Sequence, residues 1–157
     1  MTPEVVDVDQ SGASWAQVEA AAPALAAAVR ECFAVRKHCT MATLRVDGSP
    51  RISGTEVQWE SGELRIGSMP GAWKARDLQR DGRVAIHSST VDPPEGAESS
   101  WAGEAKVAGT AVELPGDGGA HAFRIDLTEV VHTKVADGGL LITSWHPDRG
   151  VREHRRT

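Results

Sequence analysis

The sequence predicts a mainly β protein, in which about six mostly antiparallel strands form a closed or nearly closed barrel with flanking helices. Short β-type segments follow one another from residue 40 to residue 145. Turn dipeptides such as Asp47-Gly48 and Ser61-Gly62 separate them, as in β-hairpins. Helical periodicity is confined to residues 15–36 and to a short stretch at residues 73–80.

The N-terminal region predicts a loose arm followed by two helical pieces. Residues 1–14 are polar, and we expect them to form the arm. Apolar side chains then recur at spacings of seven, four and four, which is helical periodicity, at Val18, Leu25, Val29 and Phe33. Pro23 is unfavourable inside a helix because it lacks an N–H group. We therefore expect a short helix before it and a main helix that begins near it.

The rest of the chain predicts strands joined by turns. We expect strands over residues 40–46, 50–59, 63–68, 83–88, 101–114, 123–134 and 140–145, and a short helix over 73–80. Gly103 and Gly109 are predicted to form bends or bulges in the longest strand. Residues 90–100 are rich in Pro, Gly and Glu and predict a loop. Because there is no internal repeat and no linker, residues 1–157 are predicted to form a single domain.

Composition excludes several classes of partner. The formal net charge is −5, with 17 Lys and Arg against 22 Asp and Glu, which predicts no nucleic-acid partner. No apolar run approaches the ~18–20 residues of a membrane span, and no apolar signal core is present. We therefore expect a cytoplasmic protein without a membrane partner. Cys32 and Cys39 lack zinc-site spacing and are predicted to be reduced thiols, and the six His predict no metal site.

Two features of composition leave alternatives open. Five Trp with no Tyr fit either ligand walls and subunit interfaces or core packing in a chain with few other aromatics. Four basic residues near the C-terminus fit either an anion site or a solvated tail: Arg149, Arg152, Arg155 and Arg156. The sequence does not decide between these interpretations.

The stretch between residues 68 and 74 has the chemistry of an anion site. Lys74 supplies an ammonium, Ser68 a hydroxyl, and the turn at Met69–Gly71 can present backbone N–H groups. A phosphate dianion needs such a cation with oriented donors. The alternative is that Lys74 and Arg51 are solvated surface charges. Neither GxSxG nor GxGxxG occurs, so the sequence offers no hydrolase elbow and no dinucleotide fingerprint.

Residues 42–54 (ATLRVDGSPRISG) and 62–88 (GELRIGSMPGAWKARDLQRDGRVAIHS) resemble the pyridoxamine 5′-phosphate oxidase-like family of flavin-binding split β-barrels. The resemblance extends more loosely through residues 101–114, 123–131 and 144–151. It implies a split barrel that binds FMN non-covalently at a homodimer interface. The implied activity is hydride transfer to or from a small organic substrate.

The same resemblance implies cofactor-binding residues. Arg51, Ser68 and Lys74 would hold the phosphate, with Ser68 six residues before Lys74 as the family spacing requires. Main-chain atoms near Ile52, Ser53 and Gly67 would face the flavin. Two further positions match cofactor contacts: Glu104, where family members often place a Gln from the second subunit, and Trp145, which matches a C-terminal Trp near the cofactor. Trp73 stands where an Arg is common.

No catalytic residue is predicted, because the sequence offers no convincing general acid. A deazaflavin coenzyme is the alternative cofactor, which would make the protein a deazaflavin-dependent reductase. Two further alternatives are a non-catalytic flavin- or haem-binding module and a structural barrel that has lost its ligand.

Overall fold

The computed structural model describes residues 12–116 and 118–157. Three α-helices, one 3₁₀ turn and nine strands follow one another in this part of the chain: α1 (Trp15–Ala21), α2 (Pro23–Val35), β1 (Cys39–Leu44), β2 (Pro50–Thr55), β3 (Val57–Glu60), β4 (Glu63–Ser68), α3 (Trp73–Arg80), β5 (Arg83–His87), η1 (Glu98–Ser100), β6 (Glu104–Glu113), β7 (His121–Ala136), β8 (Gly139–His146) and β9 (Gly150–Arg156).

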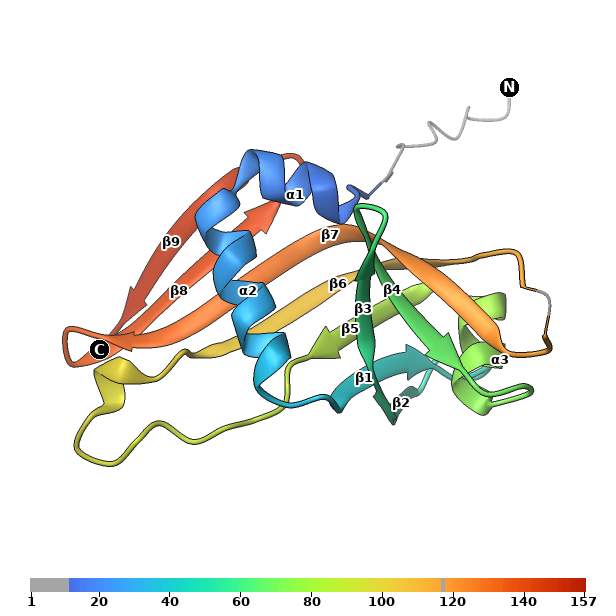
Figure 1. The fold of residues 1–157 in the computed structure, drawn as a ribbon, viewed down its shortest axis with the longest axis horizontal. Helices are drawn as coiled ribbons and strands as arrows, with labels where there is room; N and C mark the ends of the chain where they lie inside the picture. The colour runs from blue at the N-terminus through green and yellow to red at the C-terminus, as the bar shows by residue number, and fades with distance from the viewer. Residues whose placement is uncertain (1–11, 117) are drawn as a thin grey trace, which may run out of the picture.

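The strands form one antiparallel sheet that divides at β7. The main path runs β2-β1-β5-β6-β7-β4-β3, and β8 and β9 extend from β7. One edge of β7 pairs with β6 over most of its length. The other edge pairs with β4 through the first part of β7 and with β8 through the last part. Figure 1 shows the two branches diverging along β7, which gives the split barrel with flanking helices that the sequence predicts.

The predicted turns form because their residues tolerate a left-handed backbone conformation. Ser61 and Gly62 both have positive φ, 54° and 72°, and so do Asp137 and Gly138, at 51° and 77°. Two consecutive positive φ values match the right-handed twist of the strands that a two-residue hairpin connects. A bulge between Ala108 and Gly109 confirms the predicted irregularity in β6.

The strands differ most from the prediction in two places. The segment predicted as one strand over residues 50–59 is two strands, β2 and β3, with the chain turning at Glu56. The basic C-terminal segment pairs with β8 as a ninth strand, so the estimate of about six strands was too low. Every residue of β9 after Gly150 is exposed. A charged, solvent-facing edge strand lacks the apolar alternation by which strands are recognised.

The helices behave as predicted, but part of the expected arm is ordered. Residues 1–11 lie outside the described residues. Ala13 exchanges two backbone hydrogen bonds of 2.8 Å with Leu127 on β7, and the Ser14 side chain caps α1. The expectation of a loose arm was therefore wrong for Ala13 and Ser14, because β7 offers Ala13 a pairing edge.

Helices α1 and α2 cover the open side of the barrel. The periodic apolar residues Val18, Leu25, Val29 and Phe33 are all buried. Trp15 packs on Trp59 of β3 at a centroid distance of 4.4 Å. α2 contacts β6 and β7, whereas α3 contacts β1 and β6 at the other end of the barrel. Across residues 12–116 and 118–157, no helix has both the length and the apolar character required to span a membrane.

Candidate anion-binding site

Helix α3 is attached to the edge strand β2 by side chains predicted to bind phosphate. Lys74 Nζ donates to the Gly54 carbonyl at 2.8 Å. Arg51 Nε donates to Asp77 Oδ2 at 2.7 Å, and the Arg51 Cζ atom lies 5.7 Å from the centroid of the Trp73 ring. These contacts place Arg51, Lys74 and the first turn of α3 at one corner of the barrel.

Ser68 ends β4 directly before the turn that leads into α3. It alternates in phase with the buried residues Leu64 and Ile66, so its side chain lies on the inner face of the strand. Gly71 in the turn has φ of +70°, and its N–H donates to His121 Nε2 at 3.3 Å. The turn is therefore held by a left-handed backbone conformation that favours glycine and by a hydrogen bond to a β7 side chain.

The N-terminus of α3 has unpaired backbone donors. Its N-cap residue is Ala72, which makes no side-chain capping hydrogen bond, and no acidic side chain lies in the first turn. The first N–H groups of a helix have no intrahelical acceptor and carry part of the positive end of the helix dipole. With Lys74 and Arg51 beside it, this end of α3 is chemically suited to an anion.

A buried carboxylate organises the corner. The Asp77 side chain is 2% exposed. Thr43 Oγ1 donates to Asp77 Oδ2 at 2.8 Å, and Arg80 Nη2 donates to Asp77 Oδ1 at 3.1 Å and also to the Leu44 carbonyl. Because Arg51 binds Asp77 through Nε, its Nη groups form no hydrogen bond to any described residue. Asp77 thus fixes Arg51 while leaving donors for a ligand.

The pKa of the Asp77 carboxyl reflects this environment. Burial raises the pKa, but hydrogen bonds from Arg51, Thr43 and Arg80 outweigh burial and hold the pKa below the ordinary value of 3.8. Sequence reasoning missed Asp77, because nothing in the helix pattern marks it as the partner of an arginine 26 positions earlier. Thr43, Arg80 and His121 were missed for the same reason.

The lowered pKa of Asp77 predicts acid sensitivity. A group whose folded pKa lies below its unfolded pKa contributes stability that is present above the unfolded value, here 3.8, and is lost as the pH falls through the folded value. We expect the difference in unfolding free energy between the wild type and Asp77→Asn to be constant above about pH 5 and to shrink below it. Urea unfolding at several pH values measures this. If the difference in unfolding free energy grew as the pH fell, the lowered pKa of Asp77 would be contradicted.

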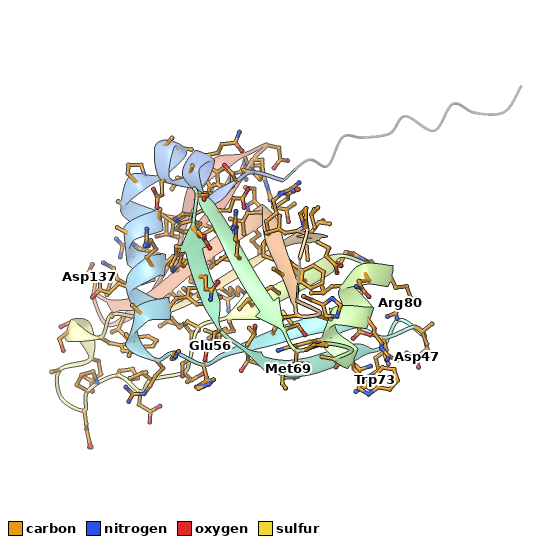
Figure 2. The ribbon with its side chains drawn as sticks, turned by 45° about the vertical axis from the view of Figure 1, so that its right-hand side comes forward. Asp47, Glu56, Met69, Trp73, Arg80 and Asp137 are labelled. Carbon is orange, nitrogen blue, oxygen red and sulfur yellow. The ribbon has the colours of Figure 1, made fainter. Side chains whose placement is uncertain are left out.

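The outer face beside β2 is apolar and exposed. Ile52 is 75% and Trp73 is 64% exposed, and Figure 2 shows Trp73 pointing away from the barrel at the α3 end. Ile52 pairs with Ala42 on β1, whose outer face forms part of a hollow of about 240 Å³. The hollow is lined by Ala42, Thr43, Leu44, Pro50, Arg83, Val84 and Ala85. An exposed apolar side chain next to a hollow, as Ile52 is here, is typical of a ligand or subunit contact.

The remaining predicted residues lie at different distances from this corner. Ser53 follows Arg51 by two positions on the same strand face, and Gly67 is exposed on β4. Glu104 lies on β6, three strands from β2 and five residues along from the row of Arg51, so it is roughly 20 Å from the corner across the sheet. Its Oε2 lies 3.7 Å from His87 Nε2. Glu104 shares the outer sheet face with Ile52, as the pairing through β1 and β5 shows.

Trp145 does not reach the corner within one chain. It is 5% exposed, belongs to the core and pairs with Val130 on β7. Ser68 pairs with His121 on the same strand. Nine residues of strand separate these two β7 positions, which is roughly 25–30 Å. A cofactor contact from Trp145 therefore stays a prediction that needs a second chain.

Other reactive groups add no catalytic candidate. Cys32 and Cys39 are free and buried. Burial, followed by the charges of Glu31 and Glu104, raises the pKa of the Cys32 thiol to about 11, so this thiol is protonated at neutral pH. Among the described residues, no three His, Cys, Asp or Glu side chains gather in a way that could hold a metal ion.

Comparison with solved structures identifies the fold. A pyridoxamine 5′-phosphate oxidase-related, FMN-binding protein from Nostoc punctiforme PCC 73102 superposes with a TM-score of 0.62 and 10% identity, covering 87% of this chain and 96% of its own. PhzG from Burkholderia lata 383, in complex with tetrahydrophenazine-1-carboxylic acid, gives 0.60 at 13% identity and covers 87% of both chains. A haem-binding protein from Mycobacterium smegmatis gives 0.51 at 14%, covering 82% and 87%.

These similarities confirm the predicted split-barrel fold, which flavin-binding and haem-binding proteins share. No protein-family model matches the sequence, and no curated protein matches it.

Proposed function

We propose that the protein is a flavin-dependent oxidoreductase that binds FMN by its phosphate at the α3 corner. The observation that carries the proposal is the meeting of Lys74, Arg51 and an uncapped helix N-terminus at the end of β4. A phosphate dianion would pair with the Lys74 ammonium and the free Nη groups of Arg51. The backbone N–H groups of the first α3 turn would complete its hydrogen bonds. The Ser68 hydroxyl, which donates to the Met69 carbonyl at 3.2 Å, would rotate toward the phosphate on binding.

The flavin ring would lie on the outer face beside Ile52. The hollow there holds about 240 Å³, below the ~300–1,000 Å³ of typical small-molecule pockets. A second copy of the chain would supply the remaining walls and would also cover Ile52, Met69 and Trp73, which are all more than half exposed. We therefore propose a homodimer with a two-fold axis, in which the cofactor lies between the subunits. Glu104 lies on this outer face and would approach the cofactor from the partner.

The bound flavin would supply the hydride chemistry, and the protein would position the ring and a small organic substrate. The chain's own contribution is electrostatic: fixed donors at the phosphate and an apolar surface that excludes water from the ring. A deazaflavin with an anionic tail fits the same corner. Haem is the second candidate, favoured by the fold shared with the haem-binding protein from Mycobacterium smegmatis.

Titration of the purified protein with FMN, with the deazaflavin and with haem distinguishes these candidates. We expect saturable binding of FMN with quenching of its fluorescence, together with a dimer in sedimentation. Preference for the deazaflavin would identify a reductase that uses reduced deazaflavin. Binding of haem alone, or of none of the three, would contradict the proposal.

A further inference from the structure

A second hollow lies away from the α3 corner, between the α1–α2 junction and the strands β7, β8 and β9. Its volume is about 430 Å³, within the ~300–1,000 Å³ range of small-molecule sites. In Figure 1 the α1–α2 junction and the β8–β9 hairpin are at the left, and α3 is at the right. We call this hollow the junction groove. Its lining contains no residue of the proposed FMN site.

The floor of the junction groove is a row of paired polar residues across three strands. His132 on β7 pairs with Thr143 on β8, and Thr143 pairs with Glu153 on β9. Lys134 is two residues beyond His132 and therefore lies on the same strand face, about 7 Å further along. All four side chains line the groove. An ammonium and several hydrogen-bonding groups thus occupy one wall.

His132 is a largely buried histidine in the lining of the groove. The residue is 7% exposed, and its Nε2 lies 2.8 Å from the Ala102 carbonyl. A carbonyl oxygen only accepts, so Nε2 donates this hydrogen bond, and in the tautomer protonated at Nε2 the other ring nitrogen, Nδ1, is an acceptor. Nδ1 has no partner among the described residues. It is not a fully buried unpaired atom either, and His132 is among the residues that line the groove.

The backbone at Gly103 holds that ring in place. Gly103 has φ of +92°. A Cβ atom there would lie 2.7 Å from His132 Nε2 and 2.3 Å from the Thr133 carbonyl. Only glycine allows the chain to pass this close to the imidazole. The direction of Nδ1 is therefore fixed by packing on the opposite side of the ring.

The roof is apolar and ends in unpaired donors. It comes from small side chains at the start of α2 and the end of α1, which project little and leave a flat surface: Ala21, Ala22, Pro23, Ala24 and Ala28. No side chain caps α2, and its first turn has no acidic residue. The N–H groups of Ala24 and Leu25 therefore lack intrahelical acceptors, and the positive end of the α2 dipole lies at the groove. The C-terminal end of α1 lies beside it, because Ala22 is both the C-cap of α1 and the N-cap of α2.

We propose that the junction groove binds a small aromatic carboxylate that also carries a hydroxyl or amino group. The carboxylate lies between the ammonium of Lys134 and the N-terminus of α2. The ring packs between the alanine roof and the side chains of Leu141 and Val151, and the hydroxyl or amino group donates to His132 Nδ1. The separation of Lys134 and His132 suits groups at opposite ends of one benzene ring. Glu153, at the edge of the floor, disfavours a second negative charge.

Isothermal titration of the full chain with three probes tests the site. We expect 4-hydroxybenzoate to bind at least tenfold more tightly than benzoate, which lacks the donor, and than 4-hydroxybenzamide, which lacks the charge. Lys134→Met should weaken 4-hydroxybenzoate at least tenfold and leave the amide unchanged. Glu153→Gln should strengthen both carboxylates by removing repulsion. Lys37→Met, at an exposed lysine outside the groove, is the matched control and should change nothing.

Three results would overturn the proposal: no binding of 4-hydroxybenzoate at millimolar concentration, equal binding of the amide, or unchanged binding in Lys134→Met. Repeating the titration with saturating FMN separates this site from the α3 corner. The proposal requires no competition, and displacement by FMN would assign the binding to the other site. Because the measurement does not need FMN, it stands whether or not the proposed oxidoreductase function is correct.

Discussion

Replacing Asp77 with alanine is expected to lower the free energy of unfolding by about 3 kcal/mol, because removal of one partner leaves the others of a buried ionic network uncompensated. The substitution removes the acceptor of three hydrogen bonds, from Thr43, Arg51 and Arg80. Thr43 is 2% exposed, so its hydroxyl has little access to water. Urea unfolding followed by circular dichroism measures the effect.

Asp126→Ala is the matched control for that measurement. Asp126 also accepts a hydrogen bond from an arginine Nε, that of Arg124 at 3.2 Å, but both side chains are about one-third exposed. An exposed pair of this kind contributes at most about 1 kcal/mol. Equal losses in the two variants would show that Asp77 does not organise the α3 corner.

Replacing Lys74 with alanine is expected to weaken FMN binding about 10- to 100-fold, because a charge-assisted hydrogen bond contributes ~1.5–3 kcal/mol. Riboflavin, which has no phosphate, should bind the variant as it binds the wild type. Lys74 also donates to the Gly54 carbonyl, so thermal unfolding should be compared first. Fluorescence titration with both flavins measures the two affinities.

Lys37→Ala provides the control for Lys74→Ala. The Lys37 side chain is 77% exposed and its Nζ lies 3.9 Å from Glu56, so this variant removes a lysine charge away from the α3 corner. Its removal should leave both flavin affinities unchanged. If Lys74→Ala lowers the affinity for riboflavin as much as that for FMN, the lysine does not bind the phosphate and the assignment is wrong.

Local sequence determined the elements that position the site. Helix α3 has the predicted bounds, residues 73–80, because Pro70-Gly71 ends the preceding strand and helix-forming residues follow. The split at Pro23 was predictable because proline is favourable only in the first turn of α2. Both features depend on neighbouring residues alone.

Features that depend on distant pairing were not predictable. Asp77 is an acidic residue on a short amphipathic helix, a position that is ordinarily solvated. It is buried because β1 and β2 bring Thr43 and Arg51 to it. Strand β9 was missed because its register with β8 is set by pairing and not by an apolar pattern.

The predicted cofactor contacts also divide into residues that are near one another in sequence and residues that only distant pairing could bring together. Arg51 and Lys74 lie at one corner because β2 and α3 are joined by hydrogen bonds between residues fewer than 30 positions apart, Arg51 to Asp77 and Lys74 to Gly54. Glu104 and Trp145 lie on strands that are distant from this corner within one chain. A cofactor contact from either residue stays a prediction that requires a second subunit, whose placement no single sequence encodes locally.

The proposed function requires the α3 corner to bind a flavin through its phosphate. The most direct measurement is the ratio of the dissociation constants of riboflavin and FMN for the wild-type protein at fixed ionic strength. Lys74, Arg51 and the helix N-terminus acting together predict that FMN binds at least 100-fold more tightly, which corresponds to about 2.8 kcal/mol. Equal affinities would mean that the phosphate is not held, and would contradict the account.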